Sequence, residues 1–286
     1  MVFLVTPDLT GRHVEAWSAD RLPFEPKGWK RDFRDELRAA LVQLVASAGE
    51  ILAAEYVSEI RAYADTENVL LYNVGQGPLR AAAANGLRFE RRFGPPPARP
   101  VPCSWAAPHY YRYRLIPRDQ QRSGWRGVRR LAAWPSVSLG RDWSASPAAV
   151  WFAVRRAVVA DHTRHRPVQH FAVCLTLDGR ARPAGVTKVL FDGAIAALHR
   201  YQGSAEAEVA ARVAATLGIR ADEVASLLCD DTAAVLGDRD LVRPRLQGVQ
   251  WNPQDEACVL GRLICTGSRS SAGDSIAGEV WEVVAS

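Results

Sequence analysis

Lysine is nearly missing from this sequence. Only Lys27, Lys30 and Lys188 occur among 36 basic residues, and arginine supplies all the others. Together with the abundance of alanine, this composition is typical of a high-GC coding bias. Lys188 is therefore unusual, because it is the one lysine outside the N-terminal segment. Its ammonium is a compact point charge that can approach a phosphate or shift its pKa, whereas a guanidinium is a planar, permanently charged fork.

Long hydrophobic runs and closely spaced cysteines are also absent. The longest apolar runs are far shorter than the roughly 20 residues that a membrane-spanning helix needs. The first residues, MVFLVTPDLTGRH, lack the pattern of a secretory signal. Five cysteines form no CxxC pair, and an odd number without close spacing is typical of reduced thiols. We therefore expect a cytoplasmic protein with no membrane contact and no structural zinc site.

Two familiar catalytic signatures are missing as well. Gly75-Gln76-Gly77 lacks the third glycine and the helix start that a dinucleotide-binding turn requires. No Gly-x-Ser-x-Gly stretch is present, so a serine hydrolase of that type is not indicated. The net charge of +5 and the pI near 9.1 suit anionic partners, but a solvated surface explains so small an excess about as well.

The first half of the chain alternates helical and extended patterns. With 48% hydrophobic and 23% charged residues, the composition is that of a globular protein. Residues 30–48 give the clearest helix, because its apolar residues recur at helical spacing: Phe33, Leu37, Ala40, Leu41, Leu44, Val45 and Ala48. Strands are predicted at residues 51–58 and 69–74. The proline-rich residues 94–102 predict an extended linker or strap.

The second half centres on residues 168–201, which read as a buried strand, a polar loop and a helix. That helix would carry Lys188, Asp192 and His199 along one side. Ser146 and Pro147 open an earlier helix as N-cap and first residue, and residues 204–217 and 221–228 predict two more, separated at Gly218.

Helices and strands mix without a regular repeat, so we predict an α+β fold. The expected architecture is a mixed sheet packed by several helices, in one large domain or two closely packed halves. These halves would be an N-terminal α/β half, residues 1–93, and a C-terminal α+β half, residues 105–286. The proline-rich residues 94–104 would join them.

Arginine and aromatic residues gather between residues 105 and 151. Tyr111 and Tyr113 face one way on a predicted strand while Arg112 and Arg114 face the other. Further along, the same mixture includes Arg126, Arg129 and Trp125. This pattern suits nucleic-acid binding through phosphate contacts and base stacking. It equally suits a sheet surface on which arginine stems cover aromatic rings.

Carboxylates supply the candidate metal ligands. Asp65 and Glu67 lie two apart, and alternating carboxylates on a strand point the same way and can share a divalent cation. An ordinary acidic turn before a strand is the alternative. Asp230 and Asp231 follow a predicted helix, and we take Asp231 as the third ligand of a Mg²⁺ or Mn²⁺ ion.

The candidate catalytic residues surround the unusual lysine. They are Lys188 itself, Asp192 one helical turn later, and Asp178 at the end of the preceding strand. The plain alternative is that Lys188 and Asp192 form an exposed i,i+4 helix pair, which contributes about 0.3–0.5 kcal/mol.

The later part of this pattern resembles the RusA-like resolvases of Holliday junctions. That family carries an Asp-x-Asp-Asn motif, a lysine three residues on, an aspartate four residues after that, and later an acidic pair. Lys188 and Asp192 have the matching spacing, and Asp230-Asp231 matches the acidic pair after an insertion. The resemblance covers residues 182–231 only.

The first acidic motif of that family is absent from its expected place. Arg182, Ala184 and Gly185 stand there instead. Residues 65–68, Asp-Thr-Glu-Asn, are similar to the missing portion but lie in the other half of the chain. The resemblance therefore implies one composite site, built from a fused or duplicated unit, that cleaves nucleic acid.

Three functions remain open at this point. The first is a nucleic-acid-directed, Mg²⁺-dependent endonuclease or other phosphate-directed enzyme. The second is a non-catalytic component that binds DNA, RNA or a protein through the arginine and aromatic segment. The third is a small-molecule enzyme that uses His199 and Asp192 as an acid–base pair. A homo-oligomer is compatible with each of them.

Overall fold

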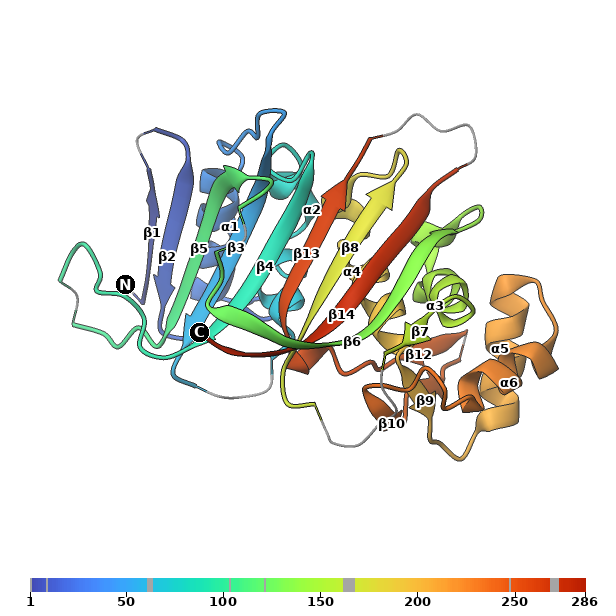
Figure 1. Cartoon of the computed structure of the whole chain (residues 1–286). Helices are drawn as coiled ribbons and strands as arrows, with labels where there is room; N and C mark the ends of the chain where they lie inside the picture. Colours follow the sequence, from blue (N-terminus) through green and yellow to red (C-terminus); the bar gives the residue numbers. More distant parts are fainter. Residues whose placement is uncertain are drawn as a thin grey trace.

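A single mixed sheet organises the molecule. The computed structural model describes residues 2–8, 10–60, 64–102, 104–120, 122–161, 168–246, 248–267 and 273–286. Within these residues the largest sheet has ten strands, in the order β1-β2-β5-β3-β4-β13-β8-β14-β6-β7 (Figure 1). In that view several helices lie behind this sheet and others lie beside it at the lower right, and the predicted α+β fold in one large domain is confirmed. No helix of the described chain has the length and apolar content needed to cross a membrane.

The strands follow one another along the whole chain. Those of the large sheet are β1 (Phe3–Pro7), β2 (His13–Ser18), β3 (Glu50–Ser58), β4 (Gly86–Phe93), β5 (His109–Pro117), β6 (Trp125–Ser138), β7 (Val159–Ala160), β8 (Phe171–Asp178), β13 (Cys258–Cys265) and β14 (Ser275–Ala285). Two small pairs are formed by β9 (His199–Tyr201) with β10 (Gly237–Arg239), and by β11 (Val242–Pro244) with β12 (Val249–Trp251).

The helices fall between these strands. They are α1 (Trp29–Leu41), α2 (Gln76–Leu79), α3 (Pro147–Arg155), α4 (Pro183–Ala196), α5 (Glu206–Leu217) and α6 (Ala221–Cys229). Short helical turns of other types are η1 (Asn68–Tyr72), η2 (Trp143–Ala145) and η3 (Asp255–Ala257). The Ser146 hydroxyl caps α3 by accepting from the Ala148 N–H, as its sequence predicts.

The sheet contains the same topology twice. The first copy runs β2, α1, β3, a helical crossover through η1 and α2, β4 and β5. The second runs β6, α3, β8, a crossover through α4, β13 and β14. In the first copy β3 pairs in parallel with β4 and antiparallel with β5, and β5 pairs antiparallel with β2. In the second copy β8 pairs in parallel with β13 and antiparallel with β14, and β14 pairs antiparallel with β6. A fused or duplicated unit was implied only by the resemblance of the acidic motifs, and the topology shows a repeat of the strands and helices.

An approximate two-fold axis relates the copies. They meet where β4 pairs antiparallel with β13, and Arg88 lies opposite Arg262 in that register. The antiparallel seam makes the strands of one copy run opposite to those of the other. The crossover that follows β3 therefore starts at one edge of the sheet, and the crossover that follows β8 starts at the opposite edge.

The two crossovers pack against each other across this axis. The Gln76 side chain at the start of α2 donates from Nε2 to the Gly185 carbonyl of α4, at 3.4 Å. Residues of both copies are thereby brought together behind the centre of the sheet.

Two elements differ from the sequence predictions. Residues 69–74 were predicted as a strand, but residues 69–72 are helical and residues 73–74 form a turn. Val69, Leu70, Leu71 and Val74 are buried, while Tyr72 is 46% exposed. So short an apolar run has no periodicity that distinguishes strand from helix. His199, predicted on the helix of Lys188, instead begins β9, because α4 ends at Ala196.

The proline-rich residues 94–102 lie along the first copy of the repeat. The indole Nε1 of Trp17 donates to the Pro97 carbonyl at 2.9 Å, which ties this segment to β2. Strand β5 follows it and inserts between β2 and β3. The sheet itself therefore changes from the first copy to the second after β5, not at residue 93. Cys103 lies outside the described residues, and the other four cysteines form no disulfide.

The predicted apolar face of α1 forms part of the main core. Phe33, Leu37, Leu41 and Leu44 are fully buried, while Val45 remains 64% exposed. Burial of the first four side chains together was predicted from their spacing and is confirmed.

Replacement of Leu41 by alanine should lower the free energy of unfolding by about 2–5 kcal/mol, because it leaves a cavity among buried side chains. Val45→Ala is the matched control, and it should change stability by less than about 0.5 kcal/mol. Chemical denaturation of both variants measures the difference, and equal stabilities would show that α1 is peripheral to the core.

Candidate active site

Three distant segments converge on Lys188. Lys188 and Asp192 lie one turn apart on α4, so both point to the same side of that helix. Asp65 and Glu67 come from the start of the first crossover, just before η1. Asp255 belongs to η3, the turn that leads into β13. We call these five residues the Lys188 cluster.

The two-fold arrangement explains why the segments meet. The chain leaves β3 at the edge of the sheet toward which α4 runs, because β3 and β8 point in opposite directions. The Asp65 side chain then accepts from the Asn68 N–H at 3.2 Å and stabilises the first helical turn. The second half of α4 passes this turn, and η3 returns to the same edge before β13 begins.

The ammonium of Lys188 is surrounded by carboxylates. Its Nζ lies 2.7 Å from Asp65 Oδ2, 2.8 Å from Asp192 Oδ1 and 3.2 Å from Asp255 Oδ2. Glu67 Oε2 is more distant, at 3.9 Å. The plain i,i+4 pair is thus present, but it forms one part of a larger network that joins both copies of the repeat.

Charge in this network is far from balanced. Four carboxylates share one ammonium, and the Glu67 side chain is only 6% exposed. Within the described protein, Glu67 Oε2, Thr66 Oγ1 and Asn68 Oδ1 are buried without a hydrogen-bond partner. Buried polar atoms in native proteins almost always have a partner. The cluster therefore presents oxygen atoms that a proton or a cation would satisfy.

Burial is the main cause of the raised pKa values of three carboxylates in this cluster. Burial raises the pKa of Asp65 to about 6, against the attraction of Lys188 and with a further increase from Asp255. Burial likewise raises the pKa of Asp192 to about 7, although Lys188 opposes it. The pKa of Glu67 is raised well above its ordinary value by burial and by the neighbouring Asp65.

For Lys188, burial and the neighbouring charges have opposite effects on the pKa. Burial alone would lower the pKa of its ammonium, but Asp192, Asp65 and Glu67 outweigh this and raise it. Lys188 therefore stays charged at neutral pH, and one of its carboxylate neighbours is able to exchange a proton there.

Carboxylate oxygens are the ligands that Mg²⁺ and Mn²⁺ prefer. In the described part of the chain, however, no three His, Cys, Asp or Glu side chains are arranged around a common point that a metal ion could occupy. Lys188 Nζ lies between the cluster carboxylates, so a cation would require this side chain to turn aside. The oxygen donors are of the kind that a divalent cation binds, but their arrangement around Lys188 Nζ leaves no space for one.

Two predicted site residues lie elsewhere. Asp178 ends β8 at the opposite edge of the sheet from Asp65, where it accepts from the Thr266 hydroxyl at 2.9 Å. Asp231 follows α6 on the surface, close enough to Arg155 to affect the pKa of that guanidinium. Neither belongs to the Lys188 cluster, so the predicted ligand set of Asp65, Glu67 and Asp231 is not assembled. Asp178 is close in sequence to α4, and Asp231 is close in sequence to α6. This proximity does not indicate where either side chain lies relative to Lys188.

Asp255 is the residue that sequence reasoning missed. Its only local signal is an acidic pair, Asp255-Glu256, in a turn before a strand. The same signal marks Asp65 and Glu67, so a systematic search for acidic turns would have included it.

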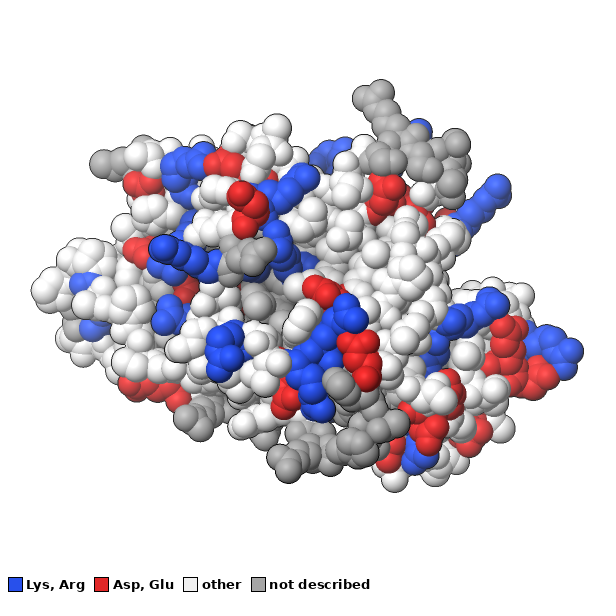
Figure 2. Space-filling view, in the orientation of Figure 1, with Lys and Arg blue, Asp and Glu red and all other residues white. Residues whose placement is uncertain are grey.

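The arginine and aromatic segment forms much of the sheet face opposite the helices. Tyr111 and Tyr113 are buried against the helices as their alternation predicts, and Arg112 and Arg114 lie on the other side of β5. Figure 2 shows basic and acidic side chains intermixed over this face. Arg112 pairs with Glu55.

On β6 the predicted nucleic-acid contacts differ in accessibility. Arg129 pairs with Glu282 at 3.0 Å, whereas Arg126 is exposed. Trp125 is only 8% exposed and donates from Nε1 to the Arg91 carbonyl. Its ring is part of a small core cluster and does not offer a stacking surface.

His199 is a buried residue with both ring nitrogens occupied. Nδ1 lies 3.1 Å from the Gly237 carbonyl, and Nε2 accepts from the Gln254 N–H at 3.3 Å. This arrangement holds β9, β10 and the turn before η3 together.

Comparison with known proteins gives no further guidance. A search of protein-family models finds no match to this chain, and no curated protein matches it.

Stability should depend on pH through the Lys188 cluster. The raised pKa values of Asp65 and Asp192, about 6 and about 7, mean that the folded state holds protons which the unfolded state has already lost. Their contribution to stability is therefore complete below about pH 4 and lost as the pH rises to about 7. We expect the parent protein to lose stability over this range by up to about 1.4 kcal/mol per pH unit for each proton released.

Asp192→Asn should remove a large part of this loss, because the amide does not ionise. Asp35→Asn, at an exposed position of α1, serves as the control and should follow the parent curve. Unfolding by urea between pH 4 and pH 8 provides the comparison, and parallel curves for the parent and Asp192→Asn would refute the assignment.

Proposed function

We propose that this protein is a phosphate-directed hydrolase of the nuclease type, with the Lys188 cluster as its active site and Mg²⁺ or Mn²⁺ as its cofactor. The observation that carries the proposal is the unbalanced charge of the cluster. Four buried or half-buried carboxylates share one ammonium, and a Glu67 oxygen has no hydrogen-bond partner. A purely structural salt bridge does not require this excess of carboxylates, because each surplus buried charge destabilises the fold.

Each residue has a distinct role in this proposal. Asp65, Glu67 and Asp192 would hold the cation, which when bound supplies charge stabilisation and an activated water. Asp255 holds the Lys188 ammonium at the cluster. Lys188 then turns from the carboxylates toward a phosphoryl oxygen and neutralises the charge that develops there.

Nucleic acid is the substrate class that the rest of the molecule favours. The chain is basic overall, and its sheet face carries Arg112, Arg114, Arg126 and Arg129. Arg112 and Arg129 are paired with glutamates, so phosphate groups would compete with these two ion pairs. The residue pattern that resembles RusA-like resolvases makes branched DNA the first substrate to test.

A non-catalytic binding component is the second candidate. The observation in its favour is that Lys188 already contacts three carboxylates at hydrogen-bonding distance or close to it. The arginine face would then provide the whole function. The acid–base pair of His199 and Asp192 has less support, because backbone groups engage both nitrogens of the histidine.

Cleavage of branched and single-stranded DNA and RNA in the presence of Mg²⁺ or Mn²⁺ tests the proposal. Glu67→Gln and Asp192→Asn should each lower the rate by about 100-fold or more, since the amide removes charge that the cation requires. Lys188→Arg keeps the charge but adds bulk, so the rate should fall without loss of folding.

Asp35→Asn is the matched control and should cleave like the parent. Melting temperatures separate loss of chemistry from loss of structure. If the parent binds nucleic acid but cleaves none of these substrates with either cation, the non-catalytic candidate replaces the nuclease proposal. If all the cluster variants cleave like the parent, the Lys188 cluster is not the active site.

A further inference from the structure

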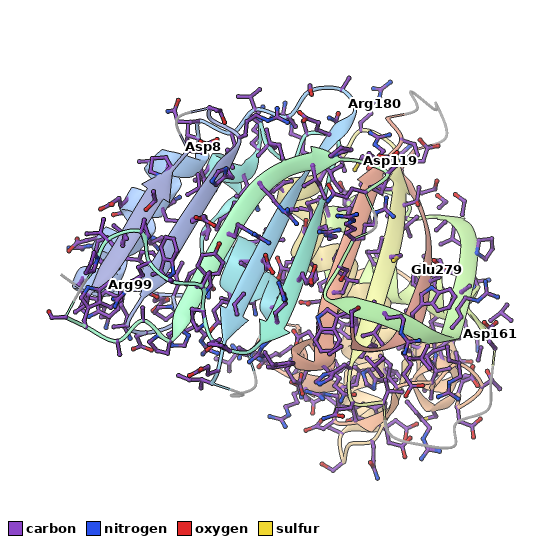
Figure 3. All side chains as sticks on the ribbon, turned by 60° about the vertical axis from the view of Figure 1, so that its left-hand side comes forward. Asp8, Arg99, Asp119, Asp161, Arg180 and Glu279 are labelled. Carbon is purple, nitrogen blue, oxygen red and sulfur yellow. The ribbon has the colours of Figure 1, made fainter. Side chains whose placement is uncertain are left out.

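A pocket lies beside the first residues of α4, away from the Lys188 cluster. It has a volume of about 760 Å³ and lies between the start of α4, the residues that follow α2, and the end of β13. Arg80, Arg180 and Arg182 line it, together with an apolar wall that includes Val42, Ala81 and Ala84. Figure 3 labels Arg180 at the upper edge of the sheet, in the loop that joins β8 to α4.

The lining of this pocket carries positive charge without compensation. It contains three arginines and no aspartate or glutamate. No ion pair among the described residues joins any of these three guanidinium groups to a carboxylate. Asp274 approaches the loop from outside the lining, and there it accepts from the Arg180 backbone N–H at 2.7 Å and from the Trp143 indole at 2.9 Å. Its oxygens are thus directed to groups other than the guanidinium of Arg180.

The pocket lies beside the start of the second crossover, as the Lys188 cluster lies beside the start of the first. The helical crossover of the first copy begins at Thr66, and that of the second begins at Pro183. With these starts aligned, Arg182 takes the place of Asp65 and Ala184 takes the place of Glu67.

The start of the second crossover thus carries an arginine and an alanine where the start of the first carries two carboxylates. The charge beside this pocket is therefore positive, which favours anions, and that of the Lys188 cluster is negative.

The backbone contributes to the same preference. Arg182 is extended, Pro183 is the first residue of α4, and no side chain caps this end of the helix. A 14-residue helix directs the positive end of its dipole at the pocket. Three arginines beside this end provide the planar donors that recognise phosphate.

We infer that this pocket binds the phosphate group of a nucleotide unit, with the attached base or sugar against the wall formed by Val42, Ala81 and Ala84. The volume is within the range of small-molecule sites, about 300–1,000 Å³. The inference concerns binding alone and does not require the Lys188 cluster to be catalytic.

Calorimetric titration at constant ionic strength tests this assignment with three probes: inorganic phosphate, AMP, and the dinucleotide ApA, whose only phosphate is an internal diester. AMP should bind more tightly than inorganic phosphate, because the wall contacts its base or sugar. Arg182→Gln should weaken AMP binding about tenfold, as expected for loss of one charged hydrogen bond. Arg31→Gln removes the same charge from an exposed position of α1 and should leave the affinity unchanged.

A second variant tests the shape of the pocket without altering its charge. Ala84→Trp fills the apolar wall and should weaken AMP binding more than phosphate binding. Glu67→Gln should retain full AMP affinity, so failure of the nuclease proposal leaves this result intact. Preference for AMP over ApA would identify a free nucleotide as the ligand, and equal affinity would identify a nucleic-acid strand. Equal AMP affinity in the parent, Arg182→Gln and Ala84→Trp would overturn the inference.

Discussion

The contact between the Lys188 ammonium and its ring of carboxylates is the interaction on which the interpretation of this protein depends. It joins α4 of one repeat to the first crossover of the other, and Asp255 adds the turn that leads into β13. Removing one partner of a buried charge network leaves the other charges uncompensated, and this typically costs about 3–5 kcal/mol. The cluster is therefore a structural junction as well as a candidate site. Its excess of carboxylate over ammonium is the feature that a structural role alone does not explain.

The duplicated topology accounts for the position of the site. Each repeat alone has a strand, a helical crossover and a parallel return strand, and the antiparallel seam between β4 and β13 sets the two crossovers against each other. Such an arrangement places one cluster of side chains near each end of the paired crossovers. One position gathers carboxylates around Lys188, and the other is lined by arginines.

Local features of the fold were predictable from the sequence, and long-range ones were not. The face of α1, the cap of α3 and the helix that carries Lys188 follow from periodicity and end signals that act over a few residues. The scarcity of lysine pointed to Lys188, and the spacing of Asp65 and Glu67 marked a carboxylate pair. Their convergence depends on the antiparallel seam, which no local pattern encodes. Because local patterns do not encode long-range contacts, Asp178 and Asp231 were predicted in the site, but each lies elsewhere.

Direct measurement of cation binding tests the central claim, that the Lys188 cluster takes a divalent metal ion. The signal of free Mn²⁺ in electron paramagnetic resonance reports its binding at pH 8, where the cluster carboxylates are more readily ionised. We expect one saturable site in the parent protein and an affinity at least about tenfold weaker in Glu67→Gln. Absence of Mn²⁺ binding in the parent, or equal affinity in both proteins, would contradict it.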